Sequence, residues 1–160
     1  MKKGFTLIEL LLYMGLFSMF MVVLTNIFIS SLDVKLESQA NSAVVADGRF
    51  ILSRLNYDIT NAGTIDLPAG LGAFGSSLQL TTDGETLIYS LDSQSNLVLT
   101  DTVGSGKLNS SETKVTAVNF RKIGNSDGGE TVRINFTLES ATLVNGQPEV
   151  RDYQTTVGLR

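Results

Sequence analysis

Two groups of residues in this sequence could do chemistry. The first is Glu9, an ionisable side chain inside residues 5–32, a stretch that is otherwise almost free of charge. A carboxylate in an apolar environment costs a few kcal/mol unless it finds a partner or a polar interface, so a plain membrane anchor has little reason to carry one. The second group is Asn125, Asp127 and Glu130 on a glycine-rich stretch, where side-chain oxygens of this kind can bind calcium.

The calcium interpretation of Asn125, Asp127 and Glu130 has a simpler alternative. Only three candidate ligands occur there, their spacing is not that of an EF-hand loop, and the same residues make a good hairpin turn. We therefore expect no cofactor and no metal site, with calcium as the alternative at this loop.

The composition argues against an enzyme. The chain has no His, no Cys and no Trp, which removes the usual general base near neutral pH, the commonest metal ligand and the Ser-His-Asp arrangement together. Absence of Cys also excludes a disulfide framework. An anchored enzyme would have to work with carboxylates alone, and no pair of acids in the sequence suggests itself.

The charge distribution argues against a nucleic-acid partner. The formal net charge is −4, and because Lys2 and Lys3 are two of the 12 basic residues, loss of residues 1–4 would leave 10 basic against 16 acidic side chains, a net charge of −6. Phosphate binding needs clustered Lys and Arg. Beyond the N-terminus the only adjacent basic pair is Arg121-Lys122, which we interpret as a solvated strand end.

The apolar run is long enough to cross a membrane. Residues 10–29 are almost entirely apolar, and about 20 helical residues span about 30 Å, the thickness of a bilayer core. Lys2 and Lys3 precede the run while Asp33 and Glu37 follow it, which predicts a single-pass protein with its N-terminus in the cytoplasm and the rest outside. A secretory signal is the alternative, but no convincing small-x-small cleavage site follows.

The sequence Gly4-Phe5-Thr6-Leu7-Ile8-Glu9-Leu10-Leu11 resembles the processing and methylation signature of type IV pilins and pseudopilins. The resemblance implies that a membrane prepilin peptidase cleaves after Gly4 and methylates the new amino group of Phe5, so that residues 1–4 are a leader. It also implies that Glu9 pairs with the terminal amine of a neighbouring subunit, a contact that a low dielectric strengthens. The alternative is that Glu9 only snorkels to the membrane interface.

The elements that carry these residues follow from periodicity. An apolar stripe continues past the membrane over Leu36, Ala40, Ala43, Val44, Ile51, Leu55, Ile59 and Ala62. The predicted helix therefore runs from residue 5 to about residue 62, roughly 87 Å. Arg54 and Asp58 could pair on its surface, and Gly48 is a possible weak point.

An irregular connector is expected over residues 63–77, followed by an antiparallel sheet over residues 78–160. Its strands are predicted at residues 78–82, 86–91, 97–100, 114–122, 131–139 and 150–159. Asp83-Gly84 is a good turn signal. The predicted fold class is α+β and pilin-like: residues 5–32 form the transmembrane and assembly half of the long helix, and residues 33–160 form an extracytoplasmic head.

Within the family, Arg49, Arg54, Asp58 and the Tyr13-containing span look like J-type minor pseudopilins of type II secretion and W-type minor pilins. This resemblance implies a subunit of the inner membrane that assembles into, or primes, a type IV pilus or a secretion pseudopilus. The implied partners are other pilin-like subunits, the prepilin peptidase and an inner-membrane assembly platform. The alternative is a binding module at a fibre tip, an adhesin or a cargo receptor. The sequence leaves open which machine the chain serves.

Overall fold

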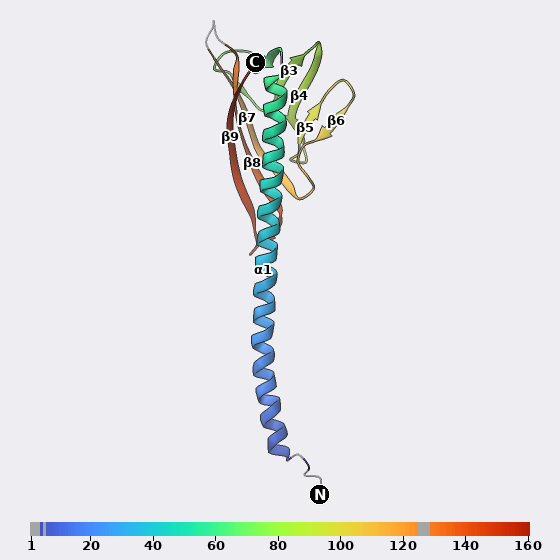
Figure 1. Ribbon diagram of the computed structural model, residues 1–160, viewed down its shortest axis with the longest axis vertical. Coiled ribbons are helices and arrows are strands. Elements are labelled where there is room, and N and C mark those ends of the chain that lie inside the picture. The colour runs from blue at the N-terminus through green and yellow to red at the C-terminus, as the bar shows by residue number, and fades with distance from the viewer. Residues whose placement is uncertain (1–3, 5, 125–128) are drawn as a thin grey trace.

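One long helix forms the axis of the molecule, and a β-rich head packs against its C-terminal half and leaves one helix face open (Figure 1). The computed structural model describes residues 4, 6–124 and 129–160. Helix α1 runs over Leu7–Thr60, 54 residues, or about 80 Å. It ends where the backbone N–H of Asn61 donates to the Tyr57 carbonyl, close to the predicted end.

The second half of α1 buries the predicted apolar stripe. Ala40, Val44, Ile51, Leu55 and Ile59 are all 1% exposed or less. They are spaced four or seven residues apart, so they lie on one helix face. Leu36, which the stripe also includes, is 39% exposed. The head covers the helix only from Ala40 onward, so the prediction that Leu36 packs against the head as part of the stripe is wrong.

The head contains two antiparallel sheets. Sheet A has the strand order β1-β3-β4-β5-β6 and sheet B the order β2-β7-β8-β9. Sheet A consists of β1 (Thr64–Leu67), β3 (Leu78–Thr82), β4 (Glu85–Leu91), β5 (Leu97–Thr100) and β6 (Ser105–Lys107). Sheet B consists of β2 (Phe74–Gly75), β7 (Thr113–Ile123), β8 (Thr131–Val144) and β9 (Gln147–Gly158). The two sheets lie on either side of α1 in the view of Figure 1.

The predicted α+β class is confirmed, with differences in detail. The strand pattern predicts one sheet, whereas the structure divides the strands into two. Residues 63–77 are predicted to be irregular, but this segment contains β1 and β2. The reason is that each strand completes an edge: β1 pairs with β3 and buries Ile65, while β2 pairs with β7.

Two tight turns fix the register of the hairpins. Asp83 and Gly84 have φ values of 51° and 86° and join Thr82 to Glu85, which are paired residues of β3 and β4. Positive φ at both central residues is the type I′ geometry, which matches the twist of paired strands and favours Asp-Gly. The predicted Asp83-Gly84 turn is therefore confirmed. Asn145 and Gly146 form the same kind of turn between β8 and β9, with φ values of 51° and 80°.

Sheet B supplies the surface on which α1 packs. Val132, Ile134, Phe136 and Leu138 alternate along β8 and are 2% exposed or less, as the period-2 pattern of this strand predicts. Their side chains join the helix stripe in one hydrophobic core. The outward residues of β8, which include Arg133 and Asn135, are exposed. Sheet B thus has one apolar face and one polar face.

Gly48 marks the closest approach between α1 and β9. A Cβ atom built at Gly48 would lie 2.2 Å from Cζ of Tyr153. The Tyr153 hydroxyl donates to the Val44 carbonyl at 2.9 Å, and the ring stacks on Phe136 with centroids 5.1 Å apart. The helix is continuous through Gly48, and this glycine provides space for Tyr153.

Gly48→Ala is expected to destabilise the head by about 1–3 kcal/mol, because the tyrosine must leave both its hydrogen bond and its stacked position. Chemical denaturation of the detergent-solubilised chain measures this change. Gly15→Ala is the matched control, since no atom lies within 4 Å of a Cβ there. The double variant Gly48→Ala/Tyr153→Ala should be no less stable than Tyr153→Ala alone. A Gly48→Ala protein of wild-type stability would contradict the packing described.

A buried acid connects α1 to sheet A. Asp58 is 5% exposed; its carboxylate accepts a 2.7 Å bond from Nε of Arg54 and a short hydrogen bond from the Tyr89 hydroxyl of β4. The predicted Arg54–Asp58 pair is therefore present, but the expectation that it lies on the surface is wrong. Tyr89, 31 residues after Asp58 in the sequence, covers the carboxylate.

The stability of the chain is expected to fall above pH 10. Burial, and next the hydrogen bond to Asp58, raise the pKa of Tyr89 above its ordinary value. An unfolded tyrosine ionises near pH ~10, whereas the folded state keeps this proton, so the stabilisation is present below pH ~10 and is lost as the pH rises further. Denaturation curves from pH 8 to pH ~12 should show a smaller loss for Tyr89→Phe than for the wild type. Tyr57→Phe, at a tyrosine that is 66% exposed, should lose stability with rising pH as the wild type does. If Tyr89→Phe also lost as much stability as the wild type, Tyr89 would not be the cause of the pH dependence.

A second ion pair joins the two sheets. Lys122 of β7 is 6% exposed, and its Nζ lies 2.6 Å from Oε1 of Glu130 and donates to the Ile65 carbonyl at 2.8 Å. The backbone N–H of Ile65 donates to Oε2 of Glu130 at 3.2 Å. Arg121 is exposed as predicted, but Lys122 is not part of a solvated strand end. It ties β1 of sheet A to sheet B.

Candidate functional site

The N-terminal end of α1 is capped by a side chain next to the predicted cleavage site. Thr6 is extended, with φ −81° and ψ 150°, and its Oγ1 accepts a 3.4 Å hydrogen bond from the backbone N–H of Glu9. Thr6 and Glu9 have the spacing of a capping box, S/T-x-x-E. This capping signal is present in the sequence but is not among the predictions made from it. The helix therefore begins directly after the Gly4-Phe5 junction.

Glu9 lies in the first turn of α1 and is exposed. This position puts a negative charge at the positive end of the helix dipole. Its neighbours Leu7, Ile8, Leu10 and Leu11 are all at least 55% exposed, so the carboxylate lies in an apolar surface. Within residues 4, 6–124 and 129–160, no Lys or Arg nitrogen lies within 4.0 Å of it. Phe5, the other predicted site residue in this region, is outside the described residues; Gly4 is exposed.

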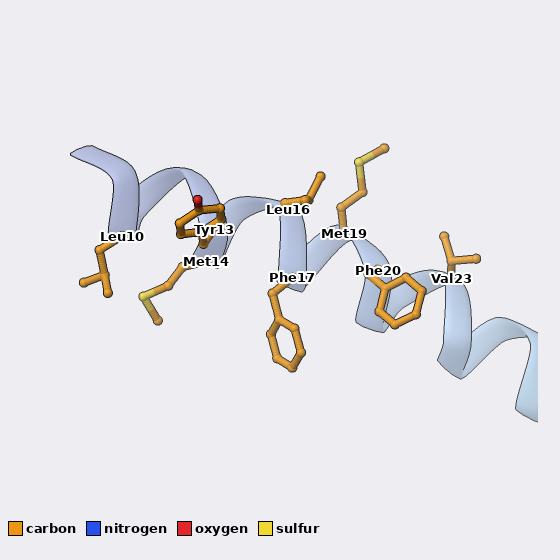
Figure 2. Close-up of a pocket in the computed structure, with 8 residues that line it drawn as sticks. All are labelled: Leu10, Tyr13, Met14, Leu16, Phe17, Met19, Phe20 and Val23. Carbon is orange, nitrogen blue, oxygen red and sulfur yellow. The ribbon is translucent and has the colours of Figure 1, made fainter. Parts of the chain in front are cut away.

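Residues 7–32 of α1, here called the apolar rod, extend away from the strands of the head (Figure 1). Every residue of the rod is exposed. Figure 2 shows the side chains of eight rod residues projecting from the helix in different directions. They are Leu10, Tyr13, Met14, Leu16, Phe17, Met19, Phe20 and Val23. The hollow that they line lies between side chains of one helix, so it is part of the rod surface.

The exposed rod requires a cover. Burial of a large apolar side chain contributes about 1.5–3 kcal/mol relative to exposure, and the rod leaves such residues unburied along its whole length. Two of its hydroxyls are compatible with an apolar surrounding: Oγ of Ser18 donates to the Gly15 carbonyl at 2.8 Å, and Oγ1 of Thr25 donates to the Met21 carbonyl at 2.9 Å. Helix α1 is long and apolar enough to cross a membrane.

The candidate calcium loop falls partly outside the structure. Asn125 and Asp127 are not among the described residues. Glu130, the remaining candidate, bonds to Lys122 and to the Ile65 N–H. In the part of the chain that the structure describes, no group of three or more His, Cys, Asp or Glu side chains could hold a metal ion.

The capped helix start, the acid in the first turn and the uncovered rod are together features of a membrane-anchored protein with a folded head. Residues 1–25 match the family model described as the prokaryotic N-terminal methylation motif. This match supports a type IV pilin-like family, a structural family whose members are processed by a prepilin peptidase and assemble with other pilin subunits. Searches of curated proteins and of solved structures found no match.

Proposed function

We propose that this chain is a minor pilin or pseudopilin that assembles into, or primes, a type IV pilus or a type II secretion pseudopilus. Prepilin peptidase would cut it after Gly4 and methylate Phe5. One observation carries the proposal: a fully exposed apolar rod with a single carboxylate in its first turn. Lipid alone explains the rod, but it does not explain Glu9.

Anchoring is the first of two states in this proposal. The 26 residues of the rod would span about 39 Å as a helix, enough for the bilayer core. Lys2 and Lys3 would hold the N-terminus on the cytoplasmic side of the inner membrane, with the head outside. The head core lies C-terminal to the rod, from Val44 onward, so the head can be complete while the rod is in lipid.

Assembly is the second state, in which flanks of neighbouring rods replace lipid. Gly15 has open space around it and would allow another helix to approach closely. Cleavage after Gly4 creates a positive amine on Phe5, and Glu9 of an adjacent subunit would neutralise it in a low dielectric. Because the amine exists only after cleavage, processing would precede entry into the fibre. The assembly platform would bring the subunits together.

The minor subtype rests on resemblance within α1. Arg49, Arg54 and Asp58 follow the pattern of J-type and W-type subunits, and no Pro interrupts Val22-Val23, where many major pilins carry one. Such subunits join others at the point where a fibre begins.

The location of the head tests the proposal. The natural chain has no Cys, and Val103 is 95% exposed, so Val103→Cys provides a unique labelling site. In cells that contain the assembly machinery, a membrane-impermeant maleimide should label this residue without permeabilisation, and the label should appear in sheared fibres. A chain that stays wholly in the membrane fraction while fibres form, or that is released as a free globule, would contradict the proposal.

A further inference from the structure

The outer face of sheet B carries two arginines directly opposite each other. Arg121 of β7 pairs in register with Arg133 of β8, and Phe74 of β2 lies opposite Arg121 on the other side. All three are exposed, Phe74 to 74%. Their neighbours along the strands, Phe120 and Ile134, point into the core. We call Phe74, Arg121 and Arg133 the arginine row.

The two cations of this row have no counter-charge within the described chain. Like charges directly opposite in a sheet are destabilising. Among residues 4, 6–124 and 129–160, no carboxylate lies within 4.0 Å of Arg121 or Arg133. Asp152, on the same face of sheet B, accepts a hydrogen bond from Thr137. Among the described residues, the arginine row is thus a positive patch without a paired carboxylate, on a chain whose net charge is −4.

Sheet A has the opposite character. Residues 64–107 contain five acidic side chains and one basic side chain. Asp83 and Glu85 flank Gly84 at the β3–β4 turn and are exposed. Neither lies within 4.0 Å of a Lys or Arg nitrogen among the described residues. We call Asp83, Gly84 and Glu85 the acidic tip, and its positive φ values make it a fixed two-residue turn.

The acidic tip and the arginine row cannot meet within one molecule. The β3–β4 hairpin lies on one side of α1, and the outer face of sheet B is turned away on the other side (Figure 1). Two different surfaces of one subunit that complement each other make a head-to-tail contact between copies. Such contacts leave a free surface at each end and generate open filaments unless the rotation closes a ring.

We infer that the acidic tip of one head docks on the arginine row of a second copy of this chain. This inference rests on the proposed fibre function and adds a contact between heads to it. Two carboxylates would meet two guanidinium groups, which favour bidentate contacts with carboxylates. Phe74 would be covered by the docked hairpin, as aromatic and Arg side chains are at the centres of interfaces. Only two copies are needed, so the contact suits a low-copy subunit.

A second copy fits this surface better than a nucleic acid does. A polyanion would be repelled by the net charge of −4 and would need more cations than one pair. The acidic tip offers two charges on a rigid turn, which equals the number of arginines in the row. The contact also predicts sensitivity to salt, since exposed charges are screened within about 10 Å at 0.1 M ionic strength.

Mixed cross-linking in membranes tests the contact. One full-length chain carries Thr86→Cys beside the acidic tip, and a second, with a different epitope tag, carries Asn119→Cys beside the arginine row. A short bismaleimide should give a dimer that contains both tags. Arg121→Glu/Arg133→Glu in the second chain, or Asp83→Asn/Glu85→Arg in the first, should each reduce the dimer at least tenfold. Asn is used at position 83 because it tolerates positive φ.

Combining the two reversed chains should restore the dimer to within about threefold, and Arg160→Glu should leave it unchanged. Wild-type yield from either reversed chain, or no restoration in the combination, would overturn the inference. The same samples report N-terminal processing and entry into the sheared-fibre fraction. Processed, fibre-associated chains without the mixed dimer would refute the head contact alone, whereas unprocessed chains would refute the proposed function as well.

Discussion

Glu9→Leu is expected to reduce incorporation into fibres by roughly 100-fold or more, while insertion into the membrane and cleavage after Gly4 continue. The rod of the variant is more apolar, so its affinity for lipid does not fall. The variant lacks the charge that would neutralise the Phe5 amine of a neighbour, and removal of one partner of a buried pair costs about 3–5 kcal/mol. Quantitative immunoblots of sheared fibres and of membranes measure the ratio.

Glu9→Gln is the matched control for shape. It keeps the length of the side chain and its place in the first turn of α1 but removes the charge, so its incorporation should also fall strongly. Glu37→Gln, at an exposed acid beyond the rod, should incorporate normally. Wild-type incorporation of Glu9→Leu would mean that Glu9 only snorkels to the interface.

Asp58→Ala is expected to destabilise the head by about 3 kcal/mol. The variant leaves the buried Tyr89 hydroxyl without its acceptor, and such an orphaned group costs about 1–3 kcal/mol; the cavity left by the missing carboxylate adds to this. The loss of the Arg54 contact adds little, because Arg54 is 42% exposed and its charge is screened by solvent. Denaturant titration of the detergent-solubilised chain, followed by tyrosine near-UV circular dichroism, measures the change.

Asp58→Asn separates the hydrogen bond from the charge. Its side-chain oxygen can still accept from Tyr89, so the loss should be clearly smaller than for Asp58→Ala. Asp33→Ala, at an exposed position before the head, should change stability by less than about 0.5 kcal/mol. An Asp58→Ala variant as stable as Asp33→Ala would contradict the role assigned to this acid.

The long helix and most strands could be predicted because their signals are local. The stripe from Ala40 to Ile59 follows the helical period, and the alternation in β8 follows the strand period. The Asp83-Gly84 turn needed only two adjacent residues. Asn145-Gly146 is an equally strong hairpin signal. It predicts that one strand ends at Val144 and the next begins at Gln147, as β8 and β9 do.

Other features depend on residues that are distant in the sequence. Strand β6, Ser105–Lys107, has no apolar alternation, and it forms because β5 offers an open edge. The role of Gly48 depends on Tyr153, whose ring lies where a Cβ atom of residue 48 would be. Burial of Asp58 depends on Tyr89, and burial of Lys122 on Glu130. No periodicity in a single segment reports such contacts.

The candidate site residues Gly4, Phe5 and Glu9 follow from residue type and spacing within a short segment, and the family model covers the same segment. Their roles in processing and assembly stay predictions. The structure adds the Thr6 cap and the full exposure of the rod. The partner that we propose for Glu9 belongs to a neighbouring subunit, so the fold of one chain does not contain it.

Mass spectrometry of the N-terminus of the chain isolated from cells is the most direct test of processing and assembly. We expect a mature protein that lacks residues 1–4, begins with Phe5 and carries one methyl group on its amine. A protein that keeps Met1, or one that is cut after the rod and released, would contradict it.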